Sequence, residues 1–253
     1  MLNNAEAHGQ IGFLKALYAI IRWSVIRHRY LLVVFTLIQM VFAVTIVYGM
    51  AFLIPALDGT ASVYLASGAM SLGIIAVGCA LAPQIISEAK INGVLTYQRT
   101  LPVPRSILLV SDMLIWCAAS VPGIIMSGIA GSVRFHIGIE VSVMGICVLL
   151  AAQLVTICIG FAIAYCFPSN IVALVTQVIM LGGLLFSPIT YPAERLPAWT
   201  MPLYNSLPFV RIAQAVRSYL FGFGSCSGSG FAVMLVWSAA AFILCLYSLS
   251  KRG

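Results

Sequence analysis

Charged side chains are scarce in this sequence, and acidic ones are the rarest. Only 8% of the 253 residues are Asp, Glu, Lys or Arg and only six are acidic, whereas hydrophobic residues make up 62%. A soluble globule needs a charged exterior to cover its apolar interior. The composition therefore excludes an ordinary soluble domain and indicates a chain that resides in a lipid bilayer.

The motifs of membrane enzymes are also missing. No H-E-x-x-H or G-x-S-x-G sequence occurs, so an intramembrane protease or a lipid hydrolase would lack its usual parts. The three lysines follow Leu14, Ala89 and Ser250, so the chain has no P-loop Gly-Lys-Ser/Thr and cannot hydrolyse a nucleotide by itself. The seven cysteines form no C-x-x-C pair, and we expect no structural disulfide, metal site or cofactor in this chain.

Ionisable residues at membrane depth, on which proton pumps and secondary transporters depend, are almost absent. Asp112 is the only acidic residue within an apolar run, close to its predicted cytoplasmic end. Arg105 precedes it by seven residues on the same helix face, so the two form either a local ion pair near the interface or part of a transport pathway. No repeated ring of charges predicts a channel filter.

What the sequence does contain is a series of long apolar runs. The run from Leu31 to Ile54 has no charged side chain and would span about 36 Å as a helix, against a hydrocarbon core of roughly 30 Å. Backbone polar groups in lipid must bond within their own segment, so we expect helices throughout. The sequence predicts an all-α polytopic membrane protein with six transmembrane helices, at 31–54, 63–87, 106–131, 141–165, 170–190 and 231–250. The fifth ends in Ser187-Pro188, which leaves open a partly re-entrant path.

The distribution of basic residues predicts the orientation of such a bundle. Nine Lys and Arg residues fall on one side of it and four on the other. By the positive-inside rule, both termini are expected in the cytoplasm and the chain in the cell (cytoplasmic) membrane. The net charge of +7 is attributed to topology and lipid contact, and no nucleic-acid partner is expected. The nine are Lys15, Arg22, Arg27, Arg29, Lys90, Arg99, Arg105, Lys251 and Arg252, and the four are Arg134, Arg195, Arg211 and Arg217.

The N-terminal segment, residues 1–30, is predicted to form an amphipathic helix in the cytoplasmic interface, ahead of a transmembrane domain at 31–253. Lys15, Arg22 and Arg29 repeat every seven residues, so they share nearly one helix face, and apolar residues cover much of the rest. The alternative is a merely basic flank to the first span. No small-residue cleavage site follows the short apolar run at 11–21, so no cleavable signal is predicted.

Two stripes of small residues predict where helices pack against each other. In lipid, close backbone approach and van der Waals contact replace the hydrophobic driving force. A role in lining a substrate path is the alternative for either stripe. The stripes are Gly123, Ser127 and Gly131 in the third span, and Ala152, Thr156, Gly160 and Ala164 in the fourth.

Two further segments carry positive information. The loop 88–105, after the second span, begins with polar residues suited to a helix that projects into the cytoplasm, and Pro102 and Pro104 predict a sharp re-entry. The segment 186–209, before the last span, has prolines that prevent a single spanning helix. Its aromatic residues suit the headgroup level of the membrane. The prolines are at 188, 192, 197, 202 and 208, and the aromatic residues are Tyr191, Trp199 and Tyr204.

Together these segments resemble the signature regions of the ABC-2 family, the membrane subunits of ATP-binding-cassette exporters, and the resemblance covers nearly the whole chain. Members carry an E-x-x-x-x-G-T-L-type stretch that ends in a T-P-V-like turn. It stands here as Glu88, Gly93, Val94 (for the usual Thr) and Leu95, then Thr100, Leu101 (which interrupts the Thr-Pro pair), Pro102 and Val103. Members also carry F-S-P-I-x-x-P-x-x-x-L-P-x-W, matched at Phe186, Ser187, Pro188, Ile189, Pro192, Leu196, Pro197 and Trp199. A later pattern is similar to Pro208 through Arg217, with Leu207 where Asn is usual.

The resemblance implies a half-transporter that exports an amphipathic substrate, such as a drug, glycolipid, polysaccharide precursor or peptide. Two copies, as a homodimer or with a paralogous permease, would form the pathway, and two ABC ATPase subunits that bind ATP and Mg²⁺ would dock below. In the coupling loop 88–105, it implies ATPase contact through Glu88, Gly93, Leu95 and Pro102. The alternative is a membrane scaffold or facilitator without an ATPase.

The outer segment 188–208 is expected to act as a gate or exit lip, and an inert outer loop is the alternative. Arg217 would hold the returning segment through a lipid phosphate or through Glu194. The residues predicted for this gate are Pro188, Tyr191, Pro192, Pro197, Trp199 and Arg217.

Overall fold

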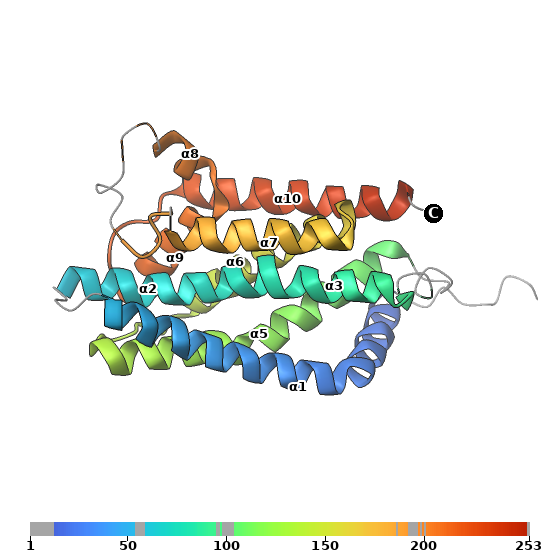
Figure 1. Cartoon of the computed structure of the whole chain (residues 1–253), viewed down its shortest axis with the longest axis horizontal. Helices are drawn as coiled ribbons and strands as arrows, with labels where there is room; N and C mark the ends of the chain where they lie inside the picture. The colour runs from blue at the N-terminus through green and yellow to red at the C-terminus, as the bar shows by residue number, and fades with distance from the viewer. Residues whose placement is uncertain are drawn as a thin grey trace, which may run out of the picture.

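The computed structural model describes residues 13–53, 59–94, 97, 104–185, 187–191, 197, 199 and 201–251. These residues form a helical bundle, and no strand occurs among them (Figure 1). The helices are α1 (Phe13–Leu53), α2 (Gly59–Ala76), the π-helical η1 (Val77–Leu81), α3 (Ala82–Ile91), α5 (Arg105–Phe135), α6 (Val143–Cys166), α7 (Ser169–Leu185), α8 (Met201–Ser206), α9 (Pro208–Phe221) and α10 (Gly228–Lys251).

The long helices run along one axis, which gives the bundle two distinct ends (Figure 1). One end, called here the α3 end, carries the end of α3, the start of α5 and the end of α10. The opposite end, called the α8 end, carries α8, α9 and the start of α2. The first described part of α1 and the last residues of α10 both lie at the α3 end.

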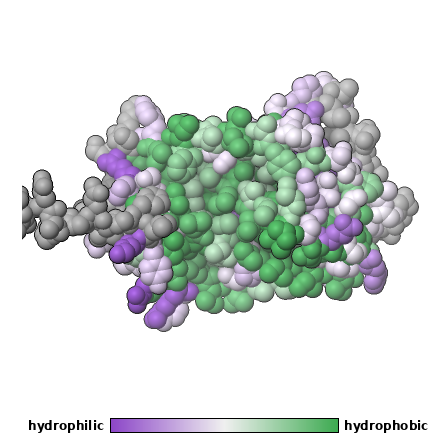
Figure 2. Space-filling model, turned by 180° about the vertical axis from the view of Figure 1, so that it is seen from behind, coloured by the Kyte–Doolittle hydropathy of each residue, from purple (hydrophilic) through white to green (hydrophobic). Residues whose placement is uncertain are grey.

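The bundle has the dimensions and surface of a multi-pass membrane protein. Five helical stretches are long and apolar enough to cross a membrane: Arg29–Gly49, Gly59–Ile91, Arg105–Phe135, Val143–Cys166 and Gly228–Leu249. On the face drawn in Figure 2, a broad hydrophobic band crosses the middle of the molecule, and hydrophilic residues gather toward both ends. The helical character that the composition predicts is therefore confirmed for the described residues, and five of the six predicted spans correspond to helices that fit a multi-pass membrane protein.

The fifth predicted span, 170–190, corresponds to a shorter helix. The 17 residues of α7 cover about 26 Å at 1.5 Å per residue, slightly less than a hydrocarbon core of roughly 30 Å. The chain is no longer helical at Ser187–Thr190. Because Pro188 disfavours a helical conformation at the residue before it, the helix ends earlier than the apolar run does.

The N-terminal segment and the first span form one helix of 41 residues, α1. No proline or glycine occurs between Phe13 and Tyr48, so nothing in the sequence breaks the hydrogen-bonded ladder. The first part of α1 nevertheless turns away from the bundle axis (Figure 1). There Leu17 and Ile20 pack on Ile107 and Leu108 at the start of α5.

The two stripes of small residues lie at helix interfaces, which confirms the packing prediction. In α6, Ala152, Thr156 and Ala164 are fully buried. A Cβ on Gly160 would overlap the carbonyl oxygen of Gly78 in η1, so α6 and η1 meet backbone to backbone. The α5 stripe packs likewise: a Cβ on Gly123 would lie 2.9 Å from Oε1 of Gln39 in α1, and one on Gly131 would lie 3.4 Å from Ala66 in α2.

The second span is one continuous helical stretch, Gly59–Ile91, of 33 residues. Its π-helical turn, Val77–Leu81, lies just before Pro83, which has no backbone N–H to donate. The N–H of Ala82 bonds instead to the carbonyl of Val77, five residues back. At about 50 Å, the stretch is roughly 20 Å longer than a hydrocarbon core, so it is longer than one crossing requires.

Candidate functional site

At the α8 end, residues Ser187–Tyr191 form a turn that is packed into the bundle, called here the buried turn. The side chains of Ser187, Ile189 and Thr190 are at most 5% exposed. The turn lies directly on α2, where a Cβ on Gly68 would lie 2.8 Å from the carbonyl oxygen of Ile189. Only a glycine at this position of α2 allows the two backbones to come so close.

Arg217 of α9 joins the buried turn to α2. Its side chain is 6% exposed. Its Nη2 donates to the carbonyl oxygen of Ile189 at 2.7 Å, and its Nε donates to Oγ of Ser67 at 3.0 Å. The guanidinium also lies 3.7 Å from the centre of the Tyr64 ring, in a cation–π contact. One side chain thus holds a turn and a spanning helix that are far apart in the sequence.

The charge of Arg217 is retained despite its burial. Removal from water lowers the pKa of the Arg217 guanidinium to about 10, so the group remains protonated at neutral pH. A buried cation is costly unless it is paired or hydrogen-bonded. The Ile189 carbonyl, the Ser67 hydroxyl and the Tyr64 ring supply this compensation. Separating the turn from α2 would therefore leave a buried charge without some of its partners.

The helix α9 positions Arg217 through clear start and stop signals. Pro208 occupies its first turn, and Gly222 caps its end in the left-handed conformation, with φ of 59°. The buried residues Ile212, Val216 and Leu220 form one face of the helix. The packing of this face places Arg217 against α2.

The residues predicted for the outer gate differ in how deeply they are buried. Pro188 is buried and Tyr191 half-buried in the same turn, and Arg217 bonds to the Ile189 carbonyl of that turn. Pro197 and Trp199 are exposed, with Trp199 at 78%. Pro192 and the expected partner Glu194 lie outside the described residues.

Sequence reasoning missed Tyr64, Ser67 and Gly68, the contacts of Arg217 and of the buried turn on α2. They are spaced three and one apart, so they lie on adjoining faces of one helical turn. A hydroxyl residue and a tyrosine within an apolar span were the available signal, because polar side chains at such depth need partners.

At the α3 end, the predicted coupling residues Glu88 and Gly93 lie at the tip of α3. Glu88 is exposed, and its carbonyl accepts the N–H of Asn92 at the end of the helix. Gly93 adopts φ of 71°, the left-handed conformation that ends helices, and its N–H bonds to the Lys90 carbonyl at 3.2 Å. Leu95 and Pro102 lie outside the described residues.

Two basic residues brace α3 and α5 against neighbouring helix ends. Nζ of Lys90 donates to the Ala164 carbonyl and, at 3.0 Å, to the Phe167 carbonyl at the end of α6. The guanidinium of Arg105 donates to the carbonyl of Leu249 near the end of α10. Cations at helix C-termini satisfy free carbonyls and complement the helix dipole. Asp112, the expected partner of Arg105, is 6% exposed within α5.

An aromatic contact joins α1 to the loop after α3. The rings of Trp23 and Tyr97 lie 6.2 Å apart, centre to centre, within the range of favourable ring pairs. The loop that carries the predicted coupling residues therefore touches the predicted interfacial helix. Contacts with α1 and α6 therefore hold the residues around the tip of α3, whereas the Glu88 side chain is exposed.

Within the part of the chain that the structure describes, no group of three or more His, Cys, Asp or Glu side chains could hold a metal ion. None of the seven cysteines, all of which the structure describes, forms a disulfide bond. No protein-family model matches the chain, and no curated protein matches it either.

Proposed function

We propose that this chain is the transmembrane subunit of an ABC-2 type exporter, with six spans, both termini in the cytoplasm of the cell membrane, and ATP hydrolysed by a separate subunit. The observation that carries the proposal is the continuous helix Gly59–Ile91. One of its ends bears the exposed Glu88, and the other bears the contacts of Arg217 and the buried turn. A force on α3 would be transmitted to the buried turn through a single helix.

The α3 end supports this role because it presents an acidic group on a braced support. Lys90 bonds to the end of α6, and the Trp23–Tyr97 contact joins the following loop to α1. A force applied at Glu88 would therefore move α3 as a unit. An acidic side chain suits a basic groove on an ATPase. Removing one partner of a desolvated ion pair of this kind costs several kcal/mol.

The α8 end supports the role because few contacts hold the buried turn closed against α2. The buried turn lies on α2 at Gly68 and is bonded there by Arg217. A shift of α2 along its axis would misalign the hydrogen bonds of Arg217 with Ser67 and Ile189 together. The turn would then leave α2 and open a path at the outer surface for an amphipathic substrate.

The assembly would contain two such chains, as a homodimer or with a paralogous permease, and two ATPase subunits that supply the ATP and Mg²⁺ sites. The surrounding lipid is the third partner. In the competing role, a scaffold or facilitator, Glu88 would contact no ATPase.

Affinity purification of the tagged chain from its native membrane tests the proposal. We expect an ABC ATPase at one copy per chain and ATP hydrolysis that responds to substrate. Glu88→Ala should reduce this response while expression stays normal, and Ser225→Ala, an exposed polar change in the loop before α10 at the α8 end, should leave it intact. Purification without an ATPase, or wild-type coupling in Glu88→Ala, would refute the proposal and favour the scaffold.

A further inference from the structure

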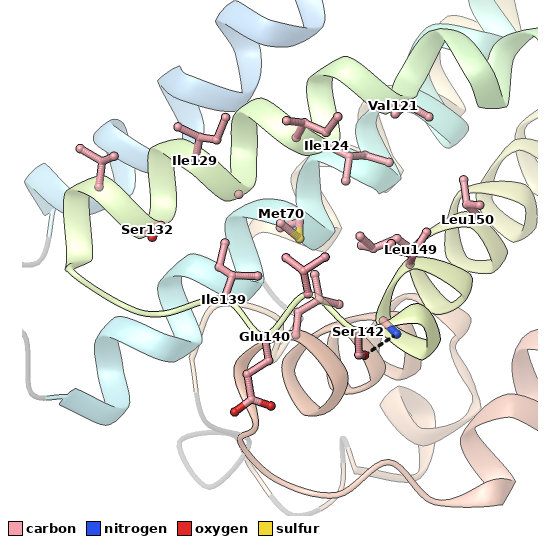
Figure 3. A pocket seen from close by; sticks show the side chains of 17 residues that line it. Met70, Val121, Ile124, Ile129, Ser132, Ile139, Glu140, Ser142, Leu149 and Leu150 are labelled. Atoms are coloured by element: carbon pink, nitrogen blue, oxygen red, sulfur yellow. Dashed lines mark hydrogen bonds between the residues drawn. The ribbon is translucent and has the colours of Figure 1, made fainter.

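A cavity of about 560 Å³ opens between α5 and α6 at the α8 end (Figure 3). Its walls come from the second half of α5, the turn at 139–142 and the first half of α6. Met70 of α2 and Leu220 of α9 close it from within. The volume lies in the range of small-molecule sites, roughly 300 to 1,000 Å³.

The cavity opens on an apolar part of the bundle surface. Three of its lining residues, Ile125, Ile129 and Ile146, are each about half exposed on the surface of the bundle. These side chains belong to two stretches that are apolar enough to span a bilayer. Water would find few polar partners in such a place, so the natural occupant is a hydrocarbon chain.

The polar groups of the lining are few, and two are already engaged. Oγ of Ser132 donates to the Ile137 carbonyl at 2.8 Å, and Oγ of Ser142 accepts the N–H of Gly145 at 2.9 Å. The remaining one is the carboxyl group of Glu140, the single ionisable residue of the lining.

Glu140 is fixed at the rim of the cavity. Its backbone N–H bonds to the Leu220 carbonyl at 2.8 Å, and its side chain is exposed. In Figure 3 the carboxylate points out of the apolar lining, away from the interior. It lies beside Gly222, where a Cβ would be 3.4 Å from Oε1 of Glu140. An acyl chain in the cavity would therefore have its head near this carboxylate.

We propose that the cavity binds the hydrocarbon chain of a cationic amphiphile whose ammonium head pairs with Glu140. The chain itself gains little from entering, because lipid tails are as apolar as the lining. Selection must therefore come from the head, and the carboxylate favours a positive one. Arg134 and His136, the basic residues nearest along the chain, are not part of the lining. This site does not depend on an ATPase, so it can be tested apart from the proposed transport role.

Photo-crosslinking of the purified chain in dodecyl maltoside micelles tests the proposal. Two probes share a sixteen-carbon chain with a diazirine near its methyl end, one with a trimethylammonium head and the other with a sulfonate head. We expect the ammonium probe to label residues 121–133 and 145–150 about fivefold more than the sulfonate probe, which is the preference that one exposed ion pair can give. Equal labelling of these segments by both probes would overturn the proposal.

Three variants separate the contribution of the probe's head from that of its hydrocarbon chain. Glu140→Gln should abolish the preference for the ammonium probe, while both probes still label the cavity. Ile146→Trp should narrow the mouth and lower labelling by both probes. Ile243→Trp, on the exposed surface of α10, should change neither. Preference retained in Glu140→Gln, or labelling unaffected by Ile146→Trp, would place the probe elsewhere and reject the site.

Discussion

Replacing Gly160 with alanine should weaken the bundle more than the size of one methyl group suggests. The new Cβ would overlap the carbonyl oxygen of Gly78 and lie 3.0 Å from both its carbonyl carbon and Cδ of Pro83. Carbon atoms in good contact are about 3.5–4.0 Å apart, so the helices would have to separate by at least about 0.5–1 Å. The obstacle is backbone and a proline ring, and neither can rotate away.

The expected loss follows from two opposing terms. Overpacking a rigid interface costs up to about 3 kcal/mol, whereas a Gly to Ala change in a helix gains about 1 kcal/mol of propensity. We therefore expect Gly160→Ala to lower the free energy of unfolding by about 2 kcal/mol. Gly182→Ala, where nothing lies within 4 Å of the added Cβ, is the matched control and should be neutral or stabilising.

Unfolding of both variants with sodium dodecyl sulfate, followed by circular dichroism, measures this difference. If Gly160→Ala were as stable as the wild type, α6 and η1 would not be in backbone contact, and the packing described for the second span would be wrong.

Three further predictions concern separate parts of the chain. Arg217→Met should leave its partners unpaired and weaken the buried turn by about 2 kcal/mol, which would be measured as faster amide hydrogen exchange in the turn. Arg211→Met, a more exposed change on the same helix, should not accelerate this exchange. Equal exchange in the two variants would contradict the role of Arg217. Gln39→Leu should be neutral or stabilising in the same unfolding assay, because neither amide atom of Gln39 has a hydrogen-bond partner among the described residues; a marked loss would reveal a bound partner. Cysteines introduced at Asn92 and Trp199, both exposed, should react with an impermeant maleimide only from the cytoplasm and only from outside, respectively, and reaction of both from one side would overturn the topology.

The sequence was sufficient for the spans whose ends coincide with the ends of apolar runs. The predicted span 106–131 lies within α5, and 141–165 nearly matches α6. The end of α7 differed because hydropathy continues to Thr190 while Pro188 stops the helix. Apolar length reports burial in lipid, but backbone chemistry decides where a helix ends.

The outer contacts could be predicted only in part. Arg217 is predicted to hold the returning chain, and its described hydrogen-bond partners are the Ile189 carbonyl of the buried turn and the Ser67 hydroxyl of α2. Ser67 and Gly68 are 150 and 149 positions away from Arg217 in the sequence, and each resembles an ordinary small residue of a helix interface. Their joint role exists only where α2, α9 and the buried turn meet.

The central claim is that force on α3 opens the buried turn, and one labelling experiment tests it. Thr190→Cys, buried in that turn, is introduced into a chain without native cysteines, and the chain is reconstituted in liposomes with its ATPase. The rate of reaction with an impermeant maleimide from the outer side is then measured with and without ATP. The account predicts that ATP accelerates labelling of Thr190→Cys, and that Glu88→Ala abolishes this acceleration. Labelling that ignores ATP, or an undiminished response in Glu88→Ala, would contradict it.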